Sequence, residues 1–162
     1  MDRVMIEGYR PGALGEVAAL HGVYYSTHWG FDATFEAKVA RGLGELFERF
    51  DATMDGFWVA RLGDELAGSI TIDGSANPLD GARLRFFITS DAARGRGIGN
   101  SLMQSSLDFC RSRKFKRAYL WTFAGLDAAR HLYEKFGFRI VEEVQGAQWG
   151  KVVREQKMVL DL

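Results

Sequence analysis

Residues 94–99 read Arg94-Gly95-Arg96-Gly97-Ile98-Gly99, and they stand between a strand-like run and an amphipathic helix. The run before them is Leu84-Arg85-Phe86-Phe87-Ile88-Thr89, and the helix is expected from about residue 98 to about residue 113. Glycines let a main chain approach a ligand closely, and the free N–H groups of a first helical turn attract anions. Two arginines add charge-assisted hydrogen bonds. The order therefore predicts a diphosphate-binding turn, with a tight connection that binds nothing as the alternative.

Two familiar phosphate motifs do not fit this turn. A dinucleotide fingerprint needs G-x-G-x-x-G, and a P-loop needs G-x-x-x-x-G-K-[ST]; neither string occurs here. The pattern that fits is [RQ]-x-x-G-x-[GA], with Arg94, Gly97 and Gly99 in register. In this respect the chain resembles the GNAT acyltransferases, whose pyrophosphate-binding motif has this form.

A second stretch strengthens the resemblance. Residues 129–138 read Ala-Arg-His-Leu-Tyr-Glu-Lys-Phe-Gly-Phe, which is similar to the A-x-x-L-Y-E-K-x-G-F helix of the family. Two motifs in the right order are more specific than either one alone. The chain most resembles the GNAT domains related to those fused to MarR-type regulators, through Leu84-Arg85-Phe86-Phe87, Trp121-Thr122 and Trp149-Gly150.

The elements expected from the sequence form one mixed α/β domain over residues 1–162. The predicted strands cover residues 4–9, 56–61, 66–73, 84–89, 118–123, 138–144 and 151–160, and the predicted helices cover residues 11–27, 33–50, 98–113 and 127–136, with a loop over residues 74–81. The resemblance implies a mostly antiparallel sheet of about seven strands flanked by about four helices. It also implies that the strands at residues 83–89 and 118–123 splay apart. Residues 1–80 would form the acceptor side, residues 81–143 the acetyl-CoA core and residues 144–162 the C-terminal strand region.

The resemblance also implies the donor and its binding residues. Acetyl-CoA would supply the acetyl group. Its pantetheine arm would lie along Phe87, Ile88 and Thr89, and its diphosphate would bind Arg94, Gly95, Arg96, Gly97, Ile98, Gly99 and Asn100. Tyr133 matches the tyrosine of the family that protonates the departing thiolate. A packed structural tyrosine is the alternative, because the periodicity places Tyr133 on the apolar face of its helix.

The acceptor region is predicted at the junction of the first two helices. Tyr24, Trp29, Phe31 and Asp32 would form an aromatic wall with a counter-charge that suits a cationic amine, unless these rings only pack the helices. The family often has a carboxylate base on the splayed strand, but residues 82–88 contain none. Either a water chain removes the proton of the amine, or a carboxylate from elsewhere in the chain does so. Asp32, Glu36 and Asp91 are candidates for that carboxylate, and the sequence assigns none of them. Leu126 replaces an asparagine that is common in the superfamily.

Composition limits the classes of partner. The 162 residues are 47% apolar with a formal net charge of zero, which favours a globular domain and argues against nucleic-acid binding. Residues 83–117 nevertheless hold nine Lys or Arg residues against two acids, as suits a ligand with several phosphates. For the basic residues between 111 and 117, a solvated helix end is the better interpretation.

The remaining signals describe the setting. The single cysteine, Cys110, fits a core position and a reducing cytoplasm. The spacing of the three histidines does not suggest a metal site, and no membrane segment is expected. We therefore predict a cytoplasmic N-acetyltransferase acting on a small amine, with a homodimer possible. An acyl-CoA-binding regulatory module and a protein acetyltransferase are the alternatives.

Overall fold

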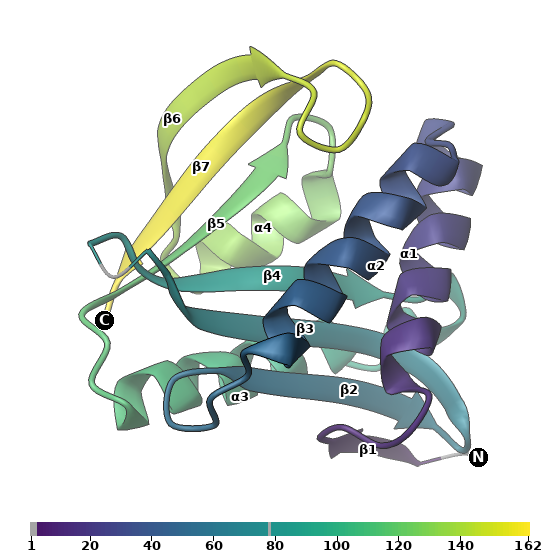
Figure 1. The fold of residues 1–162 in the computed structure, drawn as a ribbon, viewed down its shortest axis with the longest axis horizontal. Coiled ribbons are helices and arrows are strands. Elements are labelled where there is room, and N and C mark those ends of the chain that lie inside the picture. Colours follow the sequence, from purple (N-terminus) through teal and green to yellow (C-terminus); the bar gives the residue numbers. More distant parts are fainter. Residues whose placement is uncertain (1–2, 78) are drawn as a thin grey trace.

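The computed structural model describes residues 3–77 and 79–162, which form a seven-stranded sheet with helices on both faces (Figure 1). The strands run in the spatial order β1-β2-β3-β4-β5-β7-β6. The elements are β1 (Val4–Glu7), α1 (Ala13–Trp29), α2 (Ala33–Glu48), β2 (Gly56–Leu62), β3 (Glu65–Asn77), β4 (Gly81–Thr89), a short 3₁₀ turn η1 (Asp91–Ala93), α3 (Ile98–Ser112), β5 (Arg117–Phe123), α4 (Asp127–Lys135), β6 (Arg139–Gly146) and β7 (Val153–Asp161). The predicted mixed sheet with four helices is confirmed.

The sheet is antiparallel except where β4 meets β5. These two strands are parallel, and they pair only through Ala82 with Ala118 and Arg83 with Tyr119. Beyond those pairs the strands draw apart, β4 staying with β3 and β5 staying with β7 (Figure 1). The predicted splay is therefore present, and it leaves the inner edges of both strands without a neighbouring strand.

Each face of the sheet covers its own hydrophobic core. Strand β2 shows how the sequence alternates: Phe57 and Val59 pack with α1 and α2, whereas Trp58 and Ala60 pack on the side of α3 and α4. This alternation is the period of two expected for a strand buried on both faces. Helices α1 and α2 lie in front of the sheet in Figure 1, and α3 and α4 lie behind it.

The main differences from the sequence prediction concern helix α1 and strand β3. Helix α1 begins at Ala13 and not at Pro11, because Gly12 takes a left-handed conformation (φ 95°) as the N-cap residue. Strand β3 continues to Asn77 through part of the predicted loop, while Pro78 of the expected turn lies outside the described residues. Strand β7 lies between β5 and β6, an arrangement that depends on long-range pairing.

Gly81, at the start of β4, sits where the two halves of the sheet meet. Its φ is +99°, and a Cβ atom there would lie 2.2 Å from the backbone oxygen of Arg117. Both facts exclude a side chain unless the β4–β5 junction shifts. We expect Gly81→Ala to lower the free energy of unfolding by at least about 2 kcal/mol in urea denaturation.

Gly44 provides the matched control for that measurement. It lies within α2, and a Cβ atom there meets nothing within 4 Å. Gly44→Ala is expected to raise the free energy of unfolding by about 0.5–1 kcal/mol through helix propensity. Equal effects of the two substitutions would contradict the tight packing at Gly81.

Candidate active site

The glycine turn between β4 and α3 has the geometry of an anion cradle. Gly95 (φ 78°) and Gly97 (φ 71°) are both left-handed, and a Cβ atom at either position would meet nothing within 4 Å. The hydrogen bond from the N–H of Ser101 to the carbonyl of Gly97 opens the helical ladder. The N–H groups at the start of α3 consequently have no acceptor within the helix. A Cβ at Gly99 would approach Leu132 Cδ2 to 3.1 Å, so this glycine lets α3 pack closely on α4.

A cavity of about 730 Å³ opens beside this turn. The sequence-predicted donor residues gather along one side, and the ends of α1 and α4 form the other side. The lining residues are Tyr24, Tyr25, His28, Trp29, Phe87, Ile88, Thr89, Ala93, Arg94, Gly95, Gly97, Ile98, Gly99, Asn100, Gly125, Leu126, Asp127, Ala128, Ala129 and Leu132. Of the predicted donor residues, only Arg96 is not among the residues that line the cavity.

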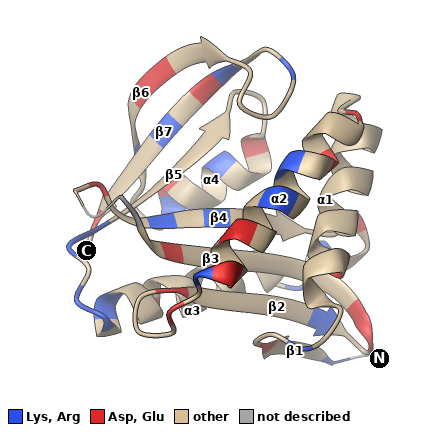
Figure 2. Ribbon diagram, in the orientation of Figure 1, with Lys and Arg blue, Asp and Glu red and all other residues tan. Residues whose placement is uncertain are grey.

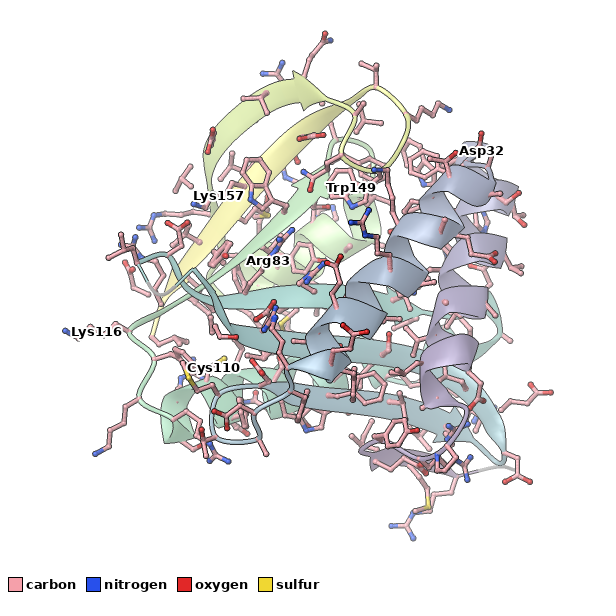
Figure 3. All side chains as sticks on the ribbon, viewed as in Figure 1. Asp32, Arg83, Cys110, Lys116, Trp149 and Lys157 are labelled. Carbon is pink, nitrogen blue, oxygen red and sulfur yellow. The ribbon has the colours of Figure 1, made fainter. Side chains whose placement is uncertain are left out.

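A second cavity of about 300 Å³ lies where β4 and β5 diverge. Residues 83–87 of β4 and residues 120–123 of β5 both line it, so the space passes between the strands. From one face His21, Tyr25, Phe35, Lys38 and Val39 contribute, from the other Leu126, Ala129 and Tyr133, and the loop before β7 adds Gln148 and Trp149. Figure 3 shows Arg83 and Trp149 in this region, beside α2. The two cavities share Tyr25, Phe87, Leu126 and Ala129, so they are contiguous.

A bulge in β4 positions the residues between the cavities. Ser69 of β3 pairs with Ile88, whereas Thr71 pairs with Arg85, so Phe86 and Phe87 together face one β3 residue. Phe86 has a φ of +53°, which is rare for an aromatic residue, and its carbonyl accepts a 2.6 Å hydrogen bond from Ser69 Oγ. Phe87, which follows the bulge, lines both cavities. Residues 87–89, where the pantetheine arm is predicted to lie, line the larger cavity.

Tyr133 lies on α4 with 6% of its surface exposed, and it lines the smaller cavity. Its ring packs against Phe87 and Phe138, with centroids 5.8 and 6.0 Å away. Its hydroxyl forms no hydrogen bond to any residue that the structure describes. Burial, and to a smaller extent the neighbouring Tyr25, raises the pKa of the Tyr133 phenol, so the group is protonated at neutral pH.

The four predicted acceptor residues do not come together. Tyr24 and Trp29 line the larger cavity, beside the glycine turn. Phe31 is 4% exposed and packs in the aromatic cluster with Phe35, at 5.0 Å between ring centroids. Asp32 lines neither cavity; it is the N-cap of α2, and its Oδ1 accepts a 3.0 Å hydrogen bond from the N–H of Thr34. A counter-charge from Asp32 is therefore absent from both cavities as described.

The other two candidate bases are also placed elsewhere. Asp91 accepts a 2.7 Å hydrogen bond from His28 Nε2 and pairs with Arg94 at 3.0 Å. The bond from His28 lowers the pKa of Asp91, which makes this carboxylate a weaker base. Glu36 packs against Gly22, where a Cβ would fall 2.0 Å from Glu36 Oε1. Within residues 3–77 and 79–162, no Asp or Glu lines the smaller cavity.

Sequence reasoning missed the residues that define the smaller cavity. Arg83 and Arg85 are two apart in β4 and line it together, with Lys38 on α2 and Trp149 before β7. Two arginines on one face of an otherwise apolar strand are the signal that could have found them. The resemblance predicts the gap between the two strands, but the side chains that line it from α2 and from the loop before β7 depend on how distant segments pack.

Two negative predictions concern cysteine and metals. Cys110 lies on α3 and is fully buried in the hydrophobic core between that helix and the sheet. Burial raises the pKa of its thiol to about 12, so the thiol is unreactive at neutral pH. Among the described residues, no three metal-ligating side chains gather at one point. No helix in that part of the chain is long and apolar enough to cross a membrane.

Comparison with known proteins identifies the family. The sequence profile of the acetyltransferase (GNAT) family matches residues 18–138, which is most of the chain. The chain belongs to the GNAT family of acetyltransferases. An N-acetyltransferase of Escherichia coli K12, YjgM, whose function is uncharacterised, is 29% identical over 141 residues, covering 85% of this chain and 83% of that protein. A second uncharacterised N-acetyltransferase, from Methanocaldococcus jannaschii, is 25% identical over 138 residues, covering 82% of this chain and 59% of that protein.

Solved structures agree with the GNAT fold. The protein PH1933 of Pyrococcus horikoshii OT3 superposes with a TM-score of 0.77 at 22% identity, covering 99% of each chain. The putative acetyltransferase yncA of Salmonella typhimurium, solved with acetyl-CoA as its cofactor, has a TM-score of 0.76 at 13% identity, covering 98% of this chain and 94% of that one. At these identities the likeness supports the fold alone.

His21 is a buried titratable group on the smaller cavity of this GNAT domain, and its position changes its pKa strongly. It is 5% exposed, and its Nδ1–H donates a 2.8 Å hydrogen bond to the carbonyl of Val17, which leaves Nε2 as the unprotonated nitrogen. Burial lowers its pKa from 6.5 to about 4. A neutral imidazole thus lines the smaller cavity at pH 7.

The shift makes stability depend on pH. As the pH falls from 6.5 towards 4, the unfolded chain takes up a proton on His21 that the folded chain does not, so the folded state loses stability. Between pH 7 and pH 5, we expect the free energy of unfolding of the wild type to fall by about 2 kcal/mol more than that of His21→Asn. Urea denaturation across this range measures the difference. His131→Asn, on the exposed side of α4, is the control and should keep the wild-type slope.

Proposed function

We propose that this protein transfers the acetyl group of acetyl-CoA to the primary amine of a small molecule, directly and within a ternary complex. The amine nitrogen attacks the thioester carbonyl carbon, the C–S bond breaks, and the departing thiolate takes a proton from the phenol of Tyr133. The proton lost by the amine passes to solvent, from which Tyr133 is reprotonated. A backbone N–H near Ile88 or Thr89 stabilises the oxyanion that forms on the way.

The two contiguous cavities support direct transfer. The larger one, about 730 Å³, is lined by the glycine turn and by residues 87–89, and it takes the donor. The smaller one, about 300 Å³, takes the acceptor; a volume at the low end for ligand sites suits a small molecule. Tyr25, Phe87, Leu126 and Ala129 line both, so the two substrates would meet without crossing solvent.

The observation that carries this assignment is the position of Tyr133. It lines the smaller cavity, and its hydroxyl has no hydrogen-bond partner in the described part of the chain. A buried hydroxyl ordinarily finds a partner, so a hydroxyl left free at a cavity is suited to a bound substrate.

The residues present fit acetyl-CoA at the larger cavity. The open faces of Gly95 and Gly97 leave room for a diphosphate at the N-terminus of α3, and Arg94 lines the same space. The free edge of β4 at residues 87–89 can pair with the amide groups of pantetheine, as an added strand would. Leu126 offers an apolar contact in place of the asparagine found in much of the superfamily.

Finer features follow from the same assignment. Residues 1–80 supply the acceptor side, residues 81–143 the donor core and residues 144–162 the closing strand. Kinship with the domains attached to MarR-type regulators rests on sequence features such as Trp121-Thr122 and Trp149-Gly150. Trp149 lines the acceptor cavity, so a subgroup feature is part of the proposed site.

Replacing Tyr133 with phenylalanine tests the proposed acid. The hydroxyl has no partner within the described chain, so its removal costs little stability. We expect kcat for CoA release to fall about 100-fold or more, while the affinity for acetyl-CoA and the melting temperature stay close to the wild-type values. Turnover is measured against polyamines, amino acids, aminoglycosides, arylamines and lysine peptides.

Other outcomes of this assay identify the alternatives. A lower melting temperature with unchanged turnover would show that Tyr133 is only structural. Faster turnover of peptides than of free amines would favour a protein acetyltransferase. Binding of acetyl-CoA with no turnover of any amine would favour a regulatory acyl-CoA sensor.

Substitution of Gly97 tests the diphosphate site. A valine there is strained at a φ of 71°, and its branched side chain points into the open face of the loop. We expect Gly97→Val to weaken acetyl-CoA binding at least about 100-fold in titration calorimetry, because hydrogen bonds to the diphosphate are lost. Gly12→Val carries similar backbone strain (φ 95°) at the start of α1, far from the loop, and should bind normally. Unchanged affinity in Gly97→Val would remove the loop from the donor site.

A further inference from the structure

The charges around the smaller cavity are all of one sign. Lys38, Arg83 and Arg85 line it, and no carboxylate among the described residues does. Figure 2 shows lysine or arginine positions both on β4 and on the part of α2 beside it. A cavity that binds a cationic acceptor usually contains an acidic side chain that attracts the positive charge. The described lining has none, so this cavity does not favour a cationic acceptor.

Arg83 is the least satisfied of these cations. Its Nε atom is buried and makes no hydrogen bond, and the side chain forms no ion pair with any residue that the structure describes. Buried guanidinium nitrogens are rarely left without an acceptor, because losing water without a replacement costs free energy. An acceptor atom supplied by a bound molecule would meet this need.

Arg85 is held in place but not neutralised. Its guanidinium lies 4.6 Å from the centroid of the Phe86 ring and 3.4 Å from Asp73 Oδ2. Gly42 of α2 makes room for it, since a Cβ there would fall 2.9 Å from Arg85 Nη2. This packing fixes the direction of the arginine towards the cavity before any ligand binds.

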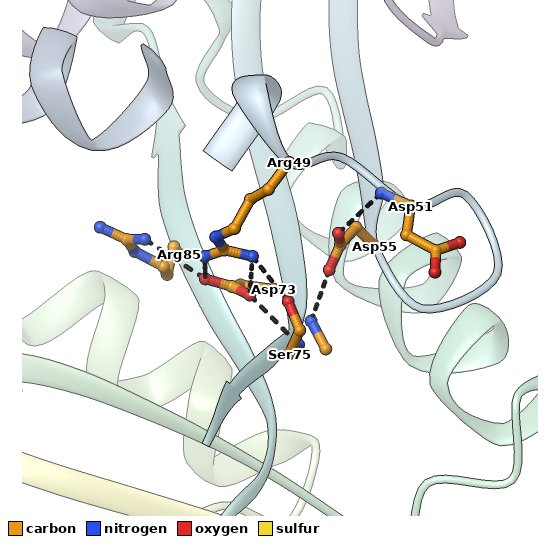
Figure 4. Close-up of polar contacts among 7 residues, drawn as sticks. Arg49, Asp51, Asp55, Asp73, Ser75 and Arg85 are labelled. Carbon is orange, nitrogen blue, oxygen red and sulfur yellow. Dashed lines mark hydrogen bonds and ion pairs between the residues drawn. The ribbon is translucent and has the colours of Figure 1, made fainter. Parts of the chain in front are cut away.

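The carboxylate nearest to Arg85 is already engaged. Arg49 donates to both oxygens of Asp73, at 3.1 and 2.7 Å, and Asp73 also accepts from Arg85 (Figure 4). One negative charge therefore serves two arginines, and Arg83 has none. Burial lowers the pKa of Arg85, and the like charge of Arg83, which lines the same cavity, lowers it further.

From this arrangement we infer that the acceptor amine carries an anionic oxygen group, a carboxylate or a phosphoryl group, which binds Arg83 and Arg85 with Lys38 at the edge. This inference rests on the proposed function and names its substrate class. Guanidinium groups match the paired oxygens of such anions, and a bound anion removes the repulsion between them. The cavity volume of about 300 Å³ limits the acceptor to a molecule of about the size of an amino acid.

The same charges affect the amine itself. Positive charges near an ammonium group lower its pKa, because the charged form is repelled. An acceptor held by its anion between these cations would lose its amine proton more readily than in water. The absence of a carboxylate base from the described lining is consistent with this arrangement.

Matched pairs of amines test the inference. Leucine is compared with isoamylamine, phenylalanine with phenethylamine, and phosphoethanolamine with ethanolamine, so that each pair differs in one anionic group. We expect the anionic member of at least one pair to have a kcat/KM at least about 100-fold above its partner. The carboxylate and phosphoryl pairs show which anion is used. Turnover of only the amines that lack an anionic group, dependent on Tyr133, would overturn the inference and leave the proposed function standing.

Arg83→Gln locates the effect. The side chain forms no hydrogen bond or ion pair with any residue that the structure describes, so the variant should fold. KM for the anionic acceptor should rise about 10- to 100-fold, with KM for acetyl-CoA unchanged. Lys38→Gln, on the exposed side of α2, is the second variant and should raise the same KM by a smaller factor. Arg41→Gln removes a surface charge from α2 outside the cavity and should have no effect. An unchanged KM in both Arg83→Gln and Lys38→Gln would overturn the inference.

A binding measurement separates this inference from catalysis. The same amines are titrated calorimetrically into protein saturated with CoA, which cannot acetylate them. Binding of an anionic amine that Arg83→Gln weakens supports the inference even if no amine is turned over, in which case only the proposed function fails. Failure of every anionic amine to bind overturns the inference.

Discussion

The early end of pairing between β4 and β5 is the constraint on which the rest of the site depends. After Arg83 and Tyr119, the inner backbone groups of both strands have no neighbouring strand, although β3 and β7 pair the outer edges. Unpaired backbone groups within a sheet are costly unless water or a ligand satisfies them. The bulge at Phe86 lies in the part of β4 that has no partner on the side of β5. A ligand that binds in the gap could pair with this free edge and complete the sheet.

The gap also joins two faces that a continuous sheet would separate. Tyr25 comes from α1 on one face and Tyr133 from α4 on the other, yet both line one cavity, and the charge of one affects the pKa of the other. Under the proposed function, side chains from opposite faces of the sheet could therefore reach the same bound substrate. In an intact sheet the strands themselves would lie between these tyrosines.

Local signals were sufficient for the elements and for the glycine turn, but not for the acceptor site. The left-handed glycines at 95 and 97 and the start of α3 follow from residues within a few positions of each other. Asp32 shows the limit: an aspartate two residues before a threonine at a helix start is typical of a cap, and capping is what its carboxylate does. Arg83, Arg85 and Lys38 line one cavity only because α2 lies across β4. The position of β7 depends on its pairing with β5. Neither arrangement can be predicted from a short stretch of sequence.

The two proposals place two kinds of anion site side by side in one domain. The glycine turn offers backbone N–H groups at a helix start, which suit a diphosphate and are indifferent to the side chains around it. The smaller cavity offers guanidinium groups fixed by Phe86, Gly42 and Asp73, and side chains of this kind are free to change without disturbing the backbone of the donor site. Strand β4 contributes to both proposed sites, but through different residues: 87–89 line the larger cavity, whereas Arg83 and Arg85 line the smaller one. Under the proposed function, acceptor specificity can therefore change by substitution of Arg83, Arg85 and Lys38 while the residues proposed to hold the donor stay the same.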